Sequence, residues 1–238
     1  SKTNISFTNK LEKHKAFNIL YYLYYYNGGG VATGDINNDG LADIYFAANS
    51  KGSNKLYLNK GNFEFEDITA NAKVMGSADW CTGVSMADIN SDGWLDIYVS
   101  TVSSKYGLKG HNELYINNRN NTFTESSAAY GLNTSCFTTQ TAFFDYDRDG
   151  DLDCYMLNQS HHPHANIVDT ANRKSYDSLS GDRLYRNEGP VVTLPSGERK
   201  GGFVDVSKQA GVYQSNLGYG LGLAIADINN DGWDDIYV

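Results

Sequence analysis

Four short segments of the chain are rich in aspartate and share one spacing of oxygen-bearing side chains. Aspartate or asparagine fills positions 1, 3, 5 and 9 of each segment, and glycine fills position 6. We call them loop one (35–43), loop two (88–96), loop three (145–153) and loop four (227–235). Ca²⁺ takes six to eight hard oxygen ligands in a flexible geometry, whereas Mg²⁺ demands a strict octahedron. The spacing therefore predicts up to four Ca²⁺ sites.

Each loop is expected to supply four side-chain ligands and, from position 7, one backbone carbonyl oxygen. The predicted ligands are Asp35, Asn37, Asp39, Leu41, Asp43, Asp88, Asn90, Asp92, Trp94, Asp96, Asp145, Asp147, Asp149, Asp151, Asp153, Asp227, Asn229, Asp231, Trp233 and Asp235. Glycine at position 6 allows the sharp turn around an ion. Loop three has aspartate at all four side-chain positions, so it is expected to bind Ca²⁺ most tightly.

The loops differ from an EF-hand, which needs Glu at position 12 and a helix on each side. Position 12 is Phe46, Val99, Met156 or Val238, and the flanking runs are typical of strands. A single copy could be an ordinary Asx-rich turn. Four copies in the same context favour a metal site over that alternative.

The similarity between the copies extends beyond the loops and predicts the fold. A short run of small and apolar residues precedes each loop, and three further β-type runs follow the first three loops in the same order. Four strands in a unit of roughly 50–60 residues are typical of a propeller blade. The sequence therefore predicts an all-β propeller of four-stranded blades, with the loops as hairpins between each blade's first two strands.

The repeats divide the chain into one propeller segment. We expect N-terminal strands over 1–26 and repeats over 27–80, 81–137 and 138–214, with a fourth repeat starting at 215–238. Repeat three carries two polar stretches, 159–182 and 190–202, which are expected to be surface loops. Because the last unit stops inside its second strand, we expect the remaining blades to come from a longer protein. Closure of the ring by the N-terminal strands is the alternative.

Composition limits the function classes. The net charge is −9, which disfavours nucleic acid and anionic lipid as partners. No stretch approaches the ~20 apolar residues of a membrane helix, so no transmembrane segment is expected. Cys81, Cys136 and Cys154 have no metal-site spacing; buried thiols are expected, with one disulfide as the alternative.

Two other clusters of residues could bind or react. His161, His162 and His164 could hold zinc or copper, or act in catalysis with Asp169 or Asp177, but an exposed loop is the simpler interpretation. The tyrosine run 21–26 could stack against sugars, although a strand with aromatic residues on both faces is favoured.

The repeat pattern resembles a known family. The stretches GVATGDINNDGLADIYF and NKLYLNKGNFEFEDIT are similar to the FG-GAP/VCBS repeats of integrin α-subunit propellers. FFDYDRDGDLDCYMLN and GDRLYRNEG resemble more closely the cartilage acidic protein and ASPIC/UnbV group of Bacteroidetes. The resemblance implies a seven-bladed propeller with calcium in the hairpin loops. It also implies an extracellular or outer-membrane setting, often with a lipid anchor upstream.

Two functions from different classes are compatible with these observations. The favoured one is a calcium-rigidified adhesion or binding module for a protein or glycan at the cell surface, without catalysis. The alternative is a polysaccharide lyase or hydrolase built on the calcium-bound scaffold. An enzyme needs paired acid and base groups in one cleft, and the sequence shows no such constellation; only 159–182 concentrates candidate residues.

Overall fold

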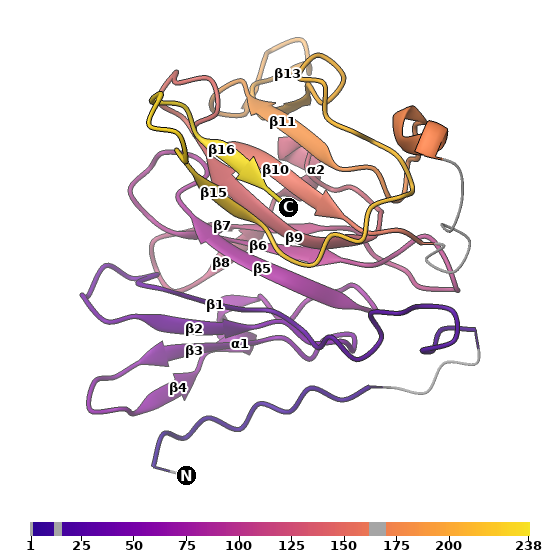
Figure 1. The fold of residues 1–238 in the computed structure, drawn as a ribbon. Helices are drawn as coiled ribbons and strands as arrows, with labels where there is room; N and C mark the ends of the chain where they lie inside the picture. The colour runs from indigo at the N-terminus through magenta and orange to yellow at the C-terminus, as the bar shows by residue number, and fades with distance from the viewer. Residues whose placement is uncertain (1, 12–15, 162–169) are drawn as a thin grey trace.

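The computed structural model describes residues 2–11, 16–161 and 170–238. It contains three four-stranded antiparallel sheets, which are stacked face to face, and a two-stranded sheet that follows them (Figure 1). In each four-stranded sheet the strands lie in chain order, interrupted in the third sheet by a separate hairpin. The predicted all-β, propeller-like arrangement of four-stranded units is confirmed.

Every predicted strand run of the repeats forms a strand. The first sheet contains β1 (Val31–Gly34), β2 (Asp43–Phe46), β3 (Lys55–Asn59) and β4 (Phe65–Asp67). The second contains β5 (Cys81–Ala87), β6 (Asp96–Thr101), β7 (Glu113–Asn117) and β8 (Phe123–Glu125). The third contains β9 (Thr138–Phe144), β10 (Asp153–Asn158), β11 (Arg183–Asn187) and β14 (Phe203–Asp205). The last pair is β15 (Ala224–Ala226) and β16 (Asp235–Tyr237).

The remaining elements are short. The helices α1 (Thr69–Ala72) and α2 (Ser127–Tyr130) follow the outermost strands of the first two sheets. The second predicted insertion, 190–202, contains an exposed hairpin of β12 (Val192–Thr193) and β13 (Arg199–Lys200). A 3₁₀ helix, η2, spans Thr170–Lys174. None of the helices in the described part of the chain has the length and apolar character needed to span a bilayer.

Two apolar layers hold the three four-stranded sheets together, because strands such as β6 are buried on both faces. Ile97 and Val99 point into the layer shared with Tyr45 of the first sheet. Tyr98, between them in sequence, points into the layer shared with Met156 of the third sheet. This alternation is the period of two that a strand imposes on its side chains, and each fully buried side chain contributes about 1.5–3 kcal/mol.

The innermost strands β1, β5 and β9 contact one another through small residues. The Thr82 hydroxyl of β5 donates to the Thr138 carbonyl of β9 at 2.6 Å, and the Ser85 hydroxyl of β5 donates to the Thr141 carbonyl of β9. A Cβ on Gly83 would lie 2.6 Å from the Thr139 carbonyl oxygen, so only glycine fits there. The small residues of the first strand thus allow the close approach of neighbouring inner strands.

The prediction of strands in the N-terminal region, 1–26, is wrong. The described part of 1–26 contains no strand; residues 2–11 lie along the first sheet, and the tyrosine run 21–26 forms turns. Phe17 and Tyr22 pack against Trp80, with Phe17 and Trp80 ring centroids 4.7 Å apart. Tyr22 also contacts Phe137. Burial against aromatic residues of two later blades therefore outweighs the strand preference of tyrosine.

The first predicted insertion, 159–182, is only partly a surface loop. Gln159, His161 and Ser180 are buried, while residues 171–176 are exposed. The Gln159 backbone N–H donates to Phe137 at 2.9 Å, which ties this end of the insertion to the second and third sheets. The expectation of a wholly exposed segment is wrong at both of its ends. His162, His164 and Asp169 lie outside the described residues.

The three cysteines are buried free thiols. Cys81 belongs to the apolar layer between the first two sheets, and Cys136 and Cys154 belong to the next one. Burial raises the pKa of Cys81 to about 12, with the nearby Glu113 carboxylate adding to the effect. At neutral pH this thiol is protonated and unreactive, so the interpretation as structural thiols is confirmed.

Candidate metal centres

The four aspartate-rich loops are β-hairpin turns at one edge of the stacked sheets (Figure 1). Each connects the first two strands of its sheet, as predicted. Two loop residues have left-handed backbone geometry: the glycine at position 6, with φ between 84° and 96°, and the residue at position 4, with φ between 56° and 64°. Position 4 is Asn38, Ser91, Arg148 or Asn230. The loops therefore share one backbone conformation.

The first aspartate organises each loop by accepting hydrogen bonds from inside it. In loop two, the Asp88 carboxylate accepts from the backbone N–H groups of Asp92 at 2.8 Å and Gly93 at 2.7 Å. The first aspartates of the other three loops, Asp35, Asp145 and Asp227, make the same two bonds. These bonds curl the backbone around the carboxylate, so the side-chain oxygens of positions 1, 3 and 5 gather on one side.

The ninth aspartate has a structural role that the sequence did not indicate. Asp96 is fully buried, and its two oxygens accept from the backbone N–H groups of Ile89 at 3.0 Å and Asn117 at 2.8 Å. Asp43 and Asp153 make the equivalent bonds in loops one and three. Burial raises the pKa of Asp96 to about 7, against the lowering effect of both bonds. The ninth position thus ties the hairpin to the third strand.

The third position separates loop three from the other loops. In loop two, the Asn90 side chain donates to the Asp92 carboxylate at 3.2 Å and accepts from the Asp92 backbone N–H at 3.1 Å. Asn37 and Asn229 make the same pair of bonds in loops one and four. Asp147 of loop three has no N–H to donate. An amide therefore partners the fifth aspartate in three loops, and a second carboxylate faces it in loop three.

Loop three consequently concentrates unpaired negative charge. One ligand oxygen each from Asp145, Asp147 and Asp149 lies within 4.8 Å of the other two. Among the described residues, Asp147 Oδ1 and Asp151 Oδ1 are buried without a hydrogen-bond partner. Burial, with the charges of Asp149 and Asp153, raises the pKa of Asp151 to about 6. A hard divalent cation fits this donor set, because it would satisfy the unpaired oxygens and offset the repulsion.

Neighbouring loops also contact one another directly. The Asn38 side chain of loop one donates to the Gly93 carbonyl of loop two at 3.2 Å. The Arg148 guanidinium of loop three lies 4.1 Å from the ring centroid of Trp233 in loop four. In both pairs the contact starts from the left-handed residue at position 4, which projects toward the next blade. Loops one and two, and loops three and four, thus contact each other along one edge of the molecule.

Sequence reasoning missed the asparagine that ends each third strand. Asn117 donates through Nδ2 to the Ile36 carbonyl of the preceding loop at 2.8 Å and to the Leu95 carbonyl at 3.0 Å. Asn187 reaches Leu152 at 3.1 Å in the same way. The signal was present, because every complete repeat ends this strand with asparagine. These residues hold the loops in place and are absent from the predicted ligand set.

The alternative catalytic site predicted from the sequence lies in the first insertion. His161 Nδ1 lies 2.8 Å from Ser180 Oγ and 3.6 Å from Asp177 Oδ1. A nucleophile–base–carboxylate relay uses both ring nitrogens, one for each partner. Here the hydroxyl and the carboxylate face the same nitrogen, and Asp177 also accepts from the Leu179 and Ser180 backbone N–H groups. This geometry favours a local structural network over a catalytic relay.

Comparison with known proteins agrees with the repeat geometry. The FG-GAP-like repeat matches residues 35–99 and 102–156, which together make up about half of the chain. The chain belongs to the FG-GAP-like repeat family. The matched segments contain loops one to three, most of the first two blades and the first two strands of the third.

Curated relatives match a longer part of the chain. Cartilage acidic protein 1 of Xenopus tropicalis is 27% identical over 201 residues, which cover 84% of this chain and 30% of the relative. The Homo sapiens protein of the same name is 28% identical over 202 residues, covering 84% of this chain and 29% of the relative. The chain therefore spans about 30% of the length of these relatives. The closer similarity to the ASPIC/UnbV group stays a prediction.

Proposed function

We propose that this chain is a calcium-stabilised binding module that recognises a protein or a glycan outside the cell or at its surface. Membership of the FG-GAP-like repeat family favours a binding or adhesion role. The observation that carries the calcium part is loop three, where a buried carboxylate oxygen of the predicted ligand Asp147 has no partner among the described residues. A buried polar atom without a partner costs about 1–3 kcal/mol, which a bound cation would recover.

The proposed ligands are the oxygens of positions 1, 3 and 5, the carbonyl of position 7 and the carboxylate of position 9. The ninth aspartates of loops one to three already accept two backbone N–H bonds each, and Asp235 of loop four accepts one from Ile228. A carboxylate has about four lone-pair sites, so these bonds leave capacity for a metal. A bound cation would supply fixed positive charge at the hairpin edge and hold the four loops rigid. No chemical transformation is required of it.

The proposed extracellular setting is supported by the calcium affinity typical of such modules and by the repeat family. Extracellular modules bind Ca²⁺ at about 10⁻⁴–10⁻³ M, which suits millimolar calcium outside cells. At ten times the dissociation constant, each site would add about 1.4 kcal/mol to the free energy of unfolding. A bacterial outer-membrane location, a lipid anchor and a seven-bladed ring completed by the rest of a longer protein stay predictions.

Isothermal titration calorimetry tests the calcium part of the proposal. We expect Ca²⁺ added to chelator-treated protein to bind at up to four sites, the tightest in loop three, and Mg²⁺ to compete poorly. The melting temperature should rise with Ca²⁺ and fall with chelator. Absence of both binding heat and a melting shift would show that the loops are ordinary Asx turns. A glycan array and a surface-protein pull-down, both with Ca²⁺, then test the ligand.

A further inference from the structure

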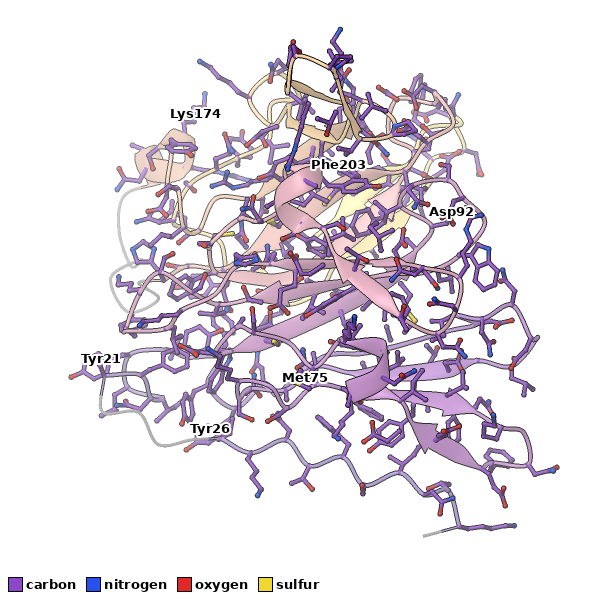
Figure 2. All side chains as sticks on the ribbon, turned by 180° about the vertical axis from the view of Figure 1, so that it is seen from behind. Tyr21, Tyr26, Met75, Asp92, Lys174 and Phe203 are labelled. Carbon is purple, nitrogen blue, oxygen red and sulfur yellow. The ribbon has the colours of Figure 1, made fainter. Side chains whose placement is uncertain are left out.

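A cavity of about 420 Å³ lies at the end of the inner strands that points away from the loops. Residues 28–30, the first residue of β1 and the N-terminal halves of β5 and β9 form much of its wall, whereas the aspartate-rich loops follow the other ends of the same strands. At about 3.3 Å per residue, the two regions are roughly 20 Å apart. In Figure 2, Tyr21 and Tyr26 lie at the end of the molecule opposite Asp92 of loop two.

Glycines shape the wall of this cavity. A Cβ on Gly29 would lie 1.9 Å from the Ala47 carbonyl oxygen, and one on Gly30 would lie 2.7 Å from the Thr82 carbonyl oxygen. No side chain fits at these positions, so the inner strands approach closely and present backbone groups and small hydroxyls. The cavity volume falls within the range of about 300–1,000 Å³ that small-molecule sites occupy.

The wall is polar but carries no charge. The residues that line the cavity include threonine, tyrosine, asparagine and glutamine, and none of them is Asp, Glu, Lys, Arg or His. This is a marked contrast with the rest of a chain in which 20% of residues are charged. A wall of hydroxyls, carboxamides and backbone groups can both donate and accept hydrogen bonds. It offers no counter-ion to a charged ligand.

Two buried polar atoms of lining residues lack a partner among the described residues. They are the Tyr24 hydroxyl and Gln159 Oε1. Tyr24 is 8% exposed and Gln159 is 1% exposed, and the Gln159 side-chain amide donates to the Tyr22 hydroxyl. Leaving buried polar groups unpaired costs free energy. Both atoms are covered in this structure, so a small side-chain shift would let a hydroxyl-bearing molecule held in the cavity supply the missing donor and acceptor.

We propose that this cavity binds a neutral saccharide unit, through hydrogen bonds to Tyr24, Gln159 and the threonine hydroxyls of the inner strands. Each sugar hydroxyl can donate to the Gln159 oxygen or pair with the Tyr24 hydroxyl, and a neutral sugar brings no charge that the wall would leave unpaired. The inference deepens the proposed function, because it names the ligand class and places it at the end opposite the metal loops.

Saturation-transfer difference NMR on the protein in its natural length tests this site. The probes are the methyl glycosides of glucose, galactose, mannose and N-acetylglucosamine, with methyl glucuronide as the charged counterpart of glucose. Tyr24→Phe removes only the unpartnered hydroxyl, so its melting temperature should stay equal to or above that of the parent. Tyr26→Phe is the matched control, because Tyr26 is 69% exposed and does not line the cavity.

We expect at least one neutral glycoside to bind, its Kd to rise about five- to tenfold in Tyr24→Phe, and the Tyr26→Phe protein to behave like the parent. The glucuronide should bind more weakly than the glucoside. The inference is overturned if no neutral glycoside binds up to about 50 mM, a concentration at which a Kd near 10 mM would still be detected. It is also overturned if Tyr24→Phe leaves the Kd unchanged, or if the glucuronide binds equally well.

The same samples separate this inference from the proposed calcium function. A calcium-dependent rise in melting temperature without saccharide binding leaves the calcium module standing and removes the cavity as a sugar site. Saccharide binding with no response to calcium or chelator leaves the cavity standing as a sugar site and removes the calcium function.

Discussion

Loop three and loop two have the same backbone shape but meet their hydrogen-bonding needs differently. In loop two, Asn90 both donates to and accepts from Asp92, so the loop is internally paired. In loop three, Asp147 meets Asp145 and Asp149 with oxygens alone, and one of its oxygens is buried without a partner among the described residues. We therefore propose that an asparagine at the third position makes a loop less dependent on a cation, whereas an aspartate makes loop three more dependent on one.

Both loops have an aspartate at the ninth position. Replacing it should therefore destabilise the protein by the same amount in either loop. We expect Asp96→Ala and Asp153→Ala each to lower the free energy of unfolding by about 3 kcal/mol in chelator, because each leaves two buried backbone N–H groups without a partner. Urea denaturation measures this effect. If Asp153→Ala costs far less than Asp96→Ala, the ninth position is not the common tie between hairpin and third strand.

Exchanging asparagine and aspartate at the third position should exchange the metal dependence of the two loops. Asp147→Asn gives loop three the amide that partners the fifth aspartate elsewhere. We expect a gain of about 1 kcal/mol without metal and a loss of about tenfold in calcium affinity at that site. Asn90→Asp is the matched reverse change in loop two and should tighten calcium binding while destabilising the metal-free protein. Calorimetry measures the calcium affinity, and chemical denaturation in chelator measures the metal-free stability. If both substitutions change these quantities in the same direction, the third position does not set the difference between the loops.

The internal repeats made the strands and loops predictable, since four copies fix the periodicity, the turn glycine and the ligand spacing. The role of Asp96 as a buried tie was not visible, because its partner Asn117 lies 21 residues away and is brought near only by strand pairing. The tyrosine run was mispredicted for a similar reason. Its conformation is set by Trp80 and Phe137 of later blades, and no repeated copy exists to compare it with.

Asp182 is a half-buried carboxylate near β11 of the third blade, outside the aspartate-rich loop. Burial raises its pKa to about 6, against hydrogen bonds from the Asn158 backbone N–H and the Tyr155 hydroxyl. An unfolded aspartate titrates near pH 3.9, so the folded state binds the proton more tightly. Its contribution to stability is fully present below about pH 4 and is lost as pH rises through about 6.

We expect Asp182→Asn to flatten the fall in stability between pH 4 and pH 7 by about 1 kcal/mol, after allowance for partial exposure. The amide can still accept from Asn158 and donate to Tyr155, so the fold should persist. The measurement is urea denaturation at both pH values with saturating calcium, which holds the loop acids constant. If the free energy of unfolding of Asp182→Asn falls with pH as steeply as that of the parent, burial of this carboxylate costs little. The burial cost inferred for the loop three carboxylates would then also be too high.

The contact between loops three and four should have the smallest effect. Arg148→Ala removes the guanidinium from the Trp233 ring and is expected to cost about 0.5–1 kcal/mol. Arg148→Lys keeps the charge but loses the planar stacking, so it should recover only part of that loss. Thermal melting and the fluorescence of Trp233 report the contact. A loss above 2 kcal/mol would mean that Arg148 supports loop three itself.

The most direct test of cation dependence is an anomalous difference map from crystals grown in calcium. We expect a peak in loop three about 2.3–2.6 Å from side-chain oxygens of Asp145, Asp147 and Asp149, stronger than any peak in the loops with asparagine at the third position. No peak in loop three at saturating calcium, or a peak in every loop except that one, would contradict it.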